Sequence, residues 1–159
     1  MSAPRFVVDT MLGRLARWLR AMGYDTLYPG QADDRALLQL AHREDRILVT
    51  RDRELARLAE PRDCCIHSEL VDEQIMETVE RLGLSPRDAG WLTRCLECNG
   101  ALVPRDRSTL RDLVPEHIFQ THTEFRACPD CGKIYWAGSH TDQMLGRLTR
   151  LFGRLGPLT

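Results

Sequence analysis

The sequence predicts an α/β protein. A parallel four-stranded sheet covered by helices is followed by a small cysteine-rich module and a C-terminal amphipathic helix. Strand-like and helix-like segments alternate four times in the first part of the chain, which is the pattern of a parallel sheet with a helix after each strand. Two Cys-x-x-Cys pairs then follow in the second half, at residues 95–98 and 128–131.

The four expected strands are short and apolar. Residues 6–8 form the first, residues 24–28 the second and residues 46–50 the clearest one, with residues 64–67 as a fourth candidate. Continuous runs of this kind are typical of strands that are buried on both faces.

Four helices are expected after these strands. In the first, Leu12, Leu15, Leu19 and Met22 recur at helical spacing and form one apolar face. Glycine after the last apolar residue ends such a helix, as at positions 23 and 83. The expected ranges are 13–22, from Asp33 or Asp34 to residue 43, 53–59 and 71–82.

Three parts of the chain are expected: a domain at 1–88, a cysteine-rich module at 89–140 and a helical tail at 141–159, with a linker near 85–87. The tail predicts an amphipathic helix over residues 141–155. Its apolar face packs on the chain itself in one interpretation, and binds a partner or a second copy in a homodimer in the other. The apolar residues are Met144, Leu145, Leu148, Leu151, Phe152 and Leu155, and the opposite face carries Arg147, Arg150 and Arg154.

The two Cys-x-x-Cys pairs indicate a structural zinc ion. Four thiolates in two short loops suit tetrahedral zinc, with Zn–S bonds of about 2.3 Å. The predicted ligands are Cys95, Cys98, Cys128 and Cys131. Gly100 and Gly132 follow the pairs and allow tight turns. Two disulfides or a redox pair are the weaker alternatives, and the stretch between the pairs is long enough to need structure of its own.

Charge and targeting signals limit the classes of function. The net charge of −1 does not suggest a bulk polyanion binder. However, residues 1–88 carry 13 Arg and 16 Asp/Glu, and the remainder carries 9 Arg/Lys and 7 Asp/Glu. This division suits an acidic catalytic domain followed by a mildly basic module that contacts nucleic acid. The opening residues resemble no signal peptide, and no apolar run approaches the ~20 residues of a membrane span. Zinc-type cysteines then predict a cytoplasmic protein without membrane contact.

Aspartates stand where the predicted strands end. Asp9 and Asp52 follow the first and third strands, and Asp33 and Asp34 open the helix after the second. The carboxyl ends of parallel strands form the binding crevice of such a sheet, so we expect these side chains to converge there. Carboxylate oxygens favour Mg²⁺ or Mn²⁺, and such a site can hydrolyse a phosphodiester. The alternative is that Asp33, Asp34 and Asp52 merely cap helices, whereas Asp9 at a strand end has less of a structural role.

Other side chains are candidates for contact with RNA. Arg14 and Arg17 share a face of the first helix and are candidates for binding RNA phosphates near the carboxylates, the alternative being that they are ordinary surface residues. Thr50 and Arg51 precede Asp52 and are candidates for binding a phosphate or a metal-bound water. In the cysteine-rich module the candidates for base stacking are Phe125, Tyr135 and Trp136, with Arg126 and Lys133 for phosphates. The alternative for these aromatics is the small core of the module.

Several runs of the chain resemble the Mut-seven C-terminal RNase family. They occur in fixed order and span about residues 5–145. The runs are FVVDTMLGRLARWLR at 6–20, ADD at 32–34, LVTRDREL at 48–55, THTEF at 121–125, CPDCGKIYW at 128–136 and GSH at 138–140.

The resemblance implies a compact PIN-like nuclease domain followed by a zinc ribbon. It implies Asp9, Asp33 or Asp34, and Asp52 as ligands of Mg²⁺ or Mn²⁺, and cleavage of single-stranded RNA. A further acid is expected among Glu54, Glu69, Asp72 and Glu73. We therefore expect a metal-dependent ribonuclease. The alternatives are a non-catalytic RNA- or ribosome-binding module and a protein-interaction adaptor.

Overall fold

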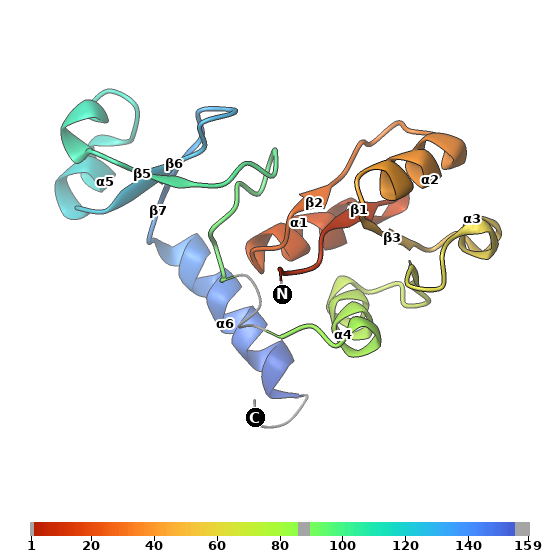
Figure 1. The fold of residues 1–159 in the computed structure, drawn as a ribbon. Helices are drawn as coiled ribbons and strands as arrows, with labels where there is room; N and C mark the ends of the chain where they lie inside the picture. The colour runs from red at the N-terminus through yellow and green to blue at the C-terminus, as the bar shows by residue number, and fades with distance from the viewer. Residues whose placement is uncertain (1, 86–89, 155–159) are drawn as a thin grey trace.

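The computed structural model describes residues 2–85 and 90–154, and these contain two separate sheets (Figure 1). The expected linker near residues 85–87 and the end of the tail helix at Leu155 fall largely outside the described residues. Within the described ranges, no helix has both the length and the apolar character needed to cross a membrane.

The first sheet is four-stranded and entirely parallel, as predicted. Its order is β2-β1-β3-β4, with β1 at Phe6–Val8, β2 at Thr26–Leu27, β3 at Ile47–Thr50 and β4 at Cys64–Cys65. The two edge strands, β2 and β4, are shorter than the expected ranges 24–28 and 64–67. After β2 the chain returns past β1 to start β3, so the direction of winding reverses between β1 and β3. Ligands of parallel sheets bind at such a reversal.

Helices cover both faces of this sheet. The short 3-10 helix η1 (Thr10–Leu12) leads into α1 (Gly13–Ala21), which shares one face with α4 (Val71–Leu82). On the other face lie α2 (Asp34–Arg43) and α3 (Arg53–Leu58). The alternation within β1 explains both layers, since Phe6 and Val8 pack with α1 and α4 whereas Val7 packs with α2.

The predicted apolar face of the first helix is confirmed. Leu12, Leu15, Leu19 and Met22 are all buried, although Met22 caps α1 instead of lying inside it. At the end of α4, Gly83 adopts a left-handed conformation with φ 62°, as expected for a C-terminal glycine.

The second sheet is antiparallel, in the order β5-β6-β7. Its strands are β5 (Val103–Arg105), β6 (Phe125–Ala127) and β7 (Ile134–Trp136), with η2 (Arg107–Thr109) and α5 (Glu116–Thr121) between β5 and β6. The long stretch between the cysteine pairs therefore holds structure, as predicted. Phe125 is buried in the core of this module, and the partly buried Trp136 packs on it at 6.4 Å between ring centroids, as in the alternative that these aromatics form the small core.

The C-terminal helix α6 (Ser139–Gly153) follows β7 and runs back along α1 and α4 (Figure 1). Packing on the chain itself is thus the interpretation that the structure confirms, because the main apolar side chains of α6 lie in the protein's own core. Arg147 was expected on the solvent face, but it instead bonds to Asp72 of α4 (Nε–Oδ1 2.7 Å) and lies over the Trp18 ring. The buried side chains are Met144, Leu148, Leu151 and Phe152.

Candidate functional site

Aspartates follow β1, β2 and β3 at the same edge of the first sheet. Each accepts a hydrogen bond from the backbone of the turn or helix that comes next. Asp9 Oδ1 accepts from Thr10 N at 2.6 Å, Asp33 Oδ1 from Ala36 N at 2.8 Å, and Asp52 Oδ1 from Glu54 N at 2.8 Å. Capping is therefore present at all three positions, and it fixes the orientation of each carboxylate.

Thr50 joins two of these aspartates at the reversal between β1 and β3. Its hydroxyl donates to Asp9 Oδ2 at 2.7 Å and accepts from Asp52 N at 3.0 Å. Thr50 was a candidate for binding a phosphate or a metal-bound water, and it is only 1% exposed. Thr50 therefore holds the Asp9 carboxylate directly and positions Asp52 through its backbone amide.

A second set of hydroxyl groups fixes the loop after β2 against the turn after β1. Thr10 Oγ1 donates to Gly30 O at 2.7 Å, and the Tyr28 hydroxyl donates to Thr10 O at 2.6 Å. Because Asp33 is the residue that caps α2, its neighbour Asp34 stands as the exposed first residue of the helix. The carboxylate of Asp34 has no protein partner within the described ranges.

The chemistry of these donors suits a hard cation. All are carboxylate oxygens, and the second oxygens of Asp33 and Asp52 accept no hydrogen bond from the described residues. The carboxylates line the edge as separate groups, since in this part of the chain no three of them approach within 4.8 Å of one another. Oxygen ligands of this type favour Mg²⁺ or Mn²⁺ over zinc.

The arginines expected near a phosphate lie in different environments. Arg14 is exposed in the first turn of α1. Arg17, one turn further, bonds to Glu97 of the first cysteine loop. Arg51 is half-buried beside Asp52, with Nη2 4.0 Å from Glu69 Oε1. Arg14 and Arg51 are thus at the acidic edge, whereas Arg17 joins α1 to the second module.

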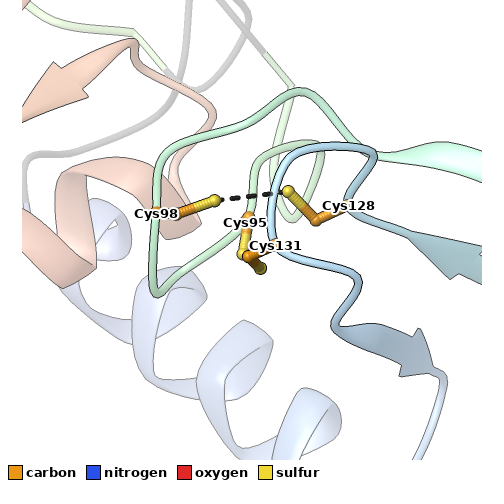
Figure 2. Close-up of side chains that lie close together, drawn as sticks. All are labelled: Cys95, Cys98, Cys128 and Cys131. Atoms are coloured by element: carbon orange, nitrogen blue, oxygen red, sulfur yellow. Dashed lines mark hydrogen bonds between the residues drawn. The ribbon is translucent and has the colours of Figure 1, made fainter.

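The four cysteines predicted as metal ligands come together (Figure 2). All four sulfurs lie within 4.8 Å of one another, with Cys95 and Cys131 3.6 Å apart and Cys98 and Cys128 3.3 Å apart. Tetrahedral zinc with bonds of about 2.3 Å requires sulfurs about 3.8 Å apart. The cluster therefore has the size and the donor chemistry of a zinc site.

The two cysteine loops share one backbone geometry. Cys95 N donates to Gly100 O and Cys128 N donates to Lys133 O. The residue fourth after each first cysteine is left-handed: Asn99 with φ 75° and Gly132 with φ 80°. The tight turn that was expected at Gly100 is therefore made by Asn99. Gly100 is needed for another reason, because a Cβ there would stand 2.6 Å from Cys128 Sγ and 2.6 Å from Asp130 Oδ2.

Replacing Gly100 by alanine is therefore expected to weaken metal binding by the cysteines. The methyl group would push the second cysteine loop away from the first, since a real Cβ does not approach atoms at 2.6 Å. Zinc content and zinc affinity of the purified variant measure this effect. Gly146→Ala on α6 is the matched control, because a Cβ there meets nothing within 4 Å. Equal zinc affinity for both variants would refute the explanation.

Tyr135 is part of the cysteine site and not a free stacking residue. Its hydroxyl lies 3.1 Å from Cys95 Sγ and accepts a hydrogen bond from Leu96 N, also at 3.1 Å. Burial raises the pKa of the Cys95 thiol, but the hydrogen bonds from Tyr135 and from the backbone of Cys98 and Glu97 outweigh it and bring that pKa to about 7. Such donors favour the thiolate, which is the form that binds metal.

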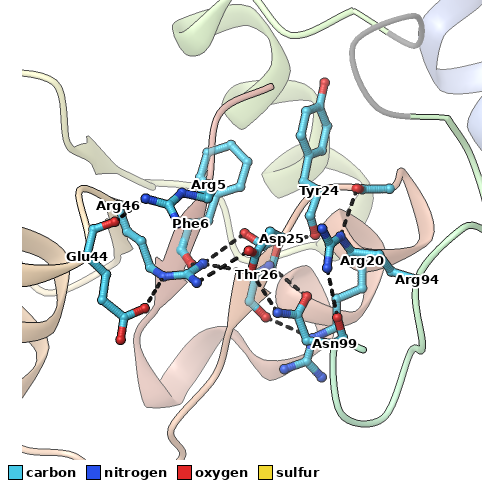
Figure 3. A network of polar contacts seen from close by, with 11 residues as sticks. Arg5, Phe6, Arg20, Tyr24, Asp25, Thr26, Glu44, Arg46, Arg94 and Asn99 are labelled. Carbon is cyan, nitrogen blue, oxygen red and sulfur yellow. Dashed lines mark hydrogen bonds and ion pairs between the residues drawn. The ribbon is translucent and has the colours of Figure 1, made fainter. Parts of the chain in front are cut away.

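A buried polar network joins the first cysteine loop to the first sheet (Figure 3). Asn99 Oδ1 accepts from Thr26 N of edge strand β2, and Asn99 Nδ2 donates to Asp25, both at 2.8 Å. Asp25 also accepts from Arg46 Nη1 at 2.7 Å. Burial raises the pKa of Asp25, but the hydrogen bonds from Arg46 and Asn99 lower it more, so that pKa lies below its usual value.

Arg20 completes the junction from α1. Its guanidinium donates to Thr26 O at 3.0 Å and to the carbonyls of Leu96 and Glu97, both at 3.1 Å. The side chain is only 7% exposed. None of the residues in this network was identified from the sequence as functional. Only Asn99 could have been found, because it occupies the position in the first loop that Gly132 holds in the second.

Comparison with known protein families gives a match to nearly the whole chain. The family described as the Mut7-C RNAse domain matches residues 4–148. This range contains the acidic edge, both cysteine loops and most of α6. No curated protein matches the chain.

Proposed function

The chain belongs to the Mut7-C RNAse domain family, and from this premise we propose that it is a Mg²⁺- or Mn²⁺-dependent ribonuclease. It hydrolyses phosphodiester bonds of single-stranded RNA at a PIN-like site on the carboxyl edge of the first sheet. The observation that supports this site is the Asp9–Thr50–Asp52 hydrogen-bond chain at the β1/β3 reversal, where parallel sheets bind ligands.

Asp9, Asp34 and Asp52 would hold the metal, and Asp33 would orient the first turn of α2 beside them. A bound Mg²⁺ or Mn²⁺ supplies a nucleophile from water and neutralises charge on the phosphate. Asp9 is buried and held through both of its oxygens, so it is the fixed member of the set. Asp34 is exposed and unpaired, so it can adjust to a substrate. Arg14 and Arg51 contact phosphates.

The four cysteines would hold a structural zinc ion. The support is the sulfur spacing together with a ligand set of thiolates only, which zinc accepts. The ion would stabilise a module whose own core is small. It would also hold the first cysteine loop in place, where Asn99 bonds to Thr26 and the Leu96 and Glu97 carbonyls bond to Arg20. Its contribution to RNA binding is an assisting one.

Replacing Thr50 by valine is expected to lower Mn²⁺ affinity and RNA cleavage by about 10–100-fold, the usual effect of losing a partner of a metal ligand. Valine keeps the shape but removes the donor to Asp9 and the acceptor for Asp52 N. Thr50→Ser restores the hydroxyl and is the control. Titration of Mn²⁺ by calorimetry measures the affinity separately from cleavage. A valine variant that binds Mn²⁺ as the serine variant does would show that Thr50 has no such role.

The proposal is tested by incubating purified protein with a labelled single-stranded RNA. We expect cutting with Mn²⁺ or Mg²⁺ and none with EDTA. The second candidate is a non-catalytic RNA- or ribosome-binding module, and the spacing of the carboxylates, with no three within 4.8 Å in the described ranges, favours it. RNA that is bound but never cut under any metal condition would support that candidate instead.

A further inference from the structure

We propose that Arg35 and Arg53, together with Arg14, bind successive phosphates of a single-stranded RNA along the carboxyl edge of the first sheet. The inference rests on the proposed function and adds a path for the substrate. Neither Arg35 nor Arg53 was identified from the sequence as a contact residue.

The first argument is the pairing of arginines. Almost every arginine side chain in the described ranges has a partner: a carboxylate, a carbonyl, a hydroxyl or an aromatic ring. Arg57 bonds to Glu54, Arg62 to Asp45 and Arg81 to Glu77, although all three are on the surface. In residues 2–85 and 90–154, four arginine side chains have none of these contacts. They are Arg14, Arg35, Arg53 and Arg150.

The second argument is position. Arg14 is the second residue of α1, Arg35 the second residue of α2 and Arg53 the first residue of α3. These helices follow β1, β2 and β3 and begin at the carboxyl edge of the sheet, so all three arginines lie at that edge. Three of the four unpaired arginines therefore gather at the edge that carries the aspartates, and only Arg150 lies elsewhere, on α6.

The layers of the fold place the three arginines around the reversal point. α2 and α3 cover one face of the sheet and α1 covers the other. Arg35 and Arg53 thus approach the edge from one face and Arg14 from the opposite one. The strand order β2-β1-β3 puts the edge position of Arg14 between those of the other two. A strand of RNA lying along the edge would meet Arg35, Arg14 and Arg53 in turn.

The third argument is electrostatic. Aspartates at this edge repel an approaching phosphate backbone, and a divalent ion offsets only part of that charge. Arg53 stands between Asp52 and Glu54 in the sequence, yet its guanidinium is bonded to neither. A guanidinium that is exposed and unpaired keeps its donors available for bidentate contact with phosphate. The three arginines therefore supply the attraction that the acidic site lacks.

The test measures RNA binding over a range of salt concentrations. Full-length protein with Asp9→Asn is used throughout, so that RNA is not cut, and the ligand is a labelled single-stranded RNA in Mg²⁺. Each phosphate contact contributes about 0.7 to the slope of log K against log[salt] for a single strand. Adding Arg35→Gln and Arg53→Gln should lower the slope by about 1.4 and weaken binding about 25-fold at 0.1 M salt.

Arg150→Gln in the same background is the matched control, because it removes one exposed and unpaired arginine away from the edge. We expect its slope to be unchanged. An unchanged slope in the double variant would overturn the proposal, and so would an equal loss per charge in Arg150→Gln, which would indicate bulk charge alone. RNA cleavage is measured separately on the chain with Asp9 intact. If that chain does not cut RNA but the double variant still shows a reduced salt slope, the proposed nuclease function is rejected and the arginine path for RNA binding stands.

Discussion

Replacing Asp9 by asparagine should lower cleavage of single-stranded RNA more than about 100-fold, because losing even an outer partner of a metal ligand costs about 10–100-fold. Asparagine has nearly the same shape as aspartate. Its side-chain oxygen can still accept the hydrogen bond from Thr10 N, which Asp9 Oδ1 accepts at 2.6 Å. The fold should therefore persist while the charge is lost. Cleavage rates in Mn²⁺ and thermal unfolding of the same preparation measure the two effects separately.

The Asp52→Asn variant separates the capping role of Asp52 from its proposed role as a metal ligand. Asparagine caps helices as well as aspartate does, so α3 should keep its start at Arg53. A large loss of cleavage with normal stability would then come from the missing charge. Asp106→Asn is the matched control, since Asp106 caps η2 in the second module through Ser108 N at 2.9 Å. Full cleavage by both Asp9→Asn and Asp52→Asn would mean that these aspartates are caps alone.

The features of this fold that depend on local sequence patterns were predictable from the sequence. Apolar spacing located α1 because Leu12, Leu15 and Leu19 must face the sheet together. Parallel strands have one carboxyl edge, so the strand pattern alone predicts that Asp9 and Asp52 lie near each other. Cysteine spacing predicted the cluster of four sulfurs for the same kind of reason, since two short loops can only clamp an ion from opposite sides.

Contacts between distant segments were not predictable. Arg20 bonds to Leu96 and Asn99 bonds to Thr26 across more than 70 residues, and no local pattern reports such pairing. The burial of Thr50 was not predictable either, because it depends on the packing of β3 between β1 and β4. Sequence spacing identifies which groups reach one edge, but packing decides which of them face solvent.

Replacing Cys98 by serine should abolish high-affinity zinc binding and unfold the second module. Structural zinc contributes about 10–16 kcal/mol to the folding of small zinc modules, whereas the buried core here consists of few side chains. They are Leu110, Val114, Phe119 and Phe125. The ion would therefore supply most of the stability of residues 90–138, and a chelator should act as the variant does. Zinc stoichiometry and hydrogen exchange over β5, β6 and β7 measure the loss.

The same variant tests whether the cysteine site supports the first sheet. Thr26 N–H, in an edge strand, is hydrogen-bonded to Asn99 Oδ1. If Cys98→Ser releases the loop, this amide should exchange much faster while the amides of central strand β3 stay protected. Cys65→Ser is the matched control, because Cys65 lies outside the cluster of four. A Thr26 amide that stays protected without zinc would mean that Asn99 and Arg20 hold the junction without the ion. Rapid exchange would mean that metal loading of one module determines the order of the strand next to Asp9.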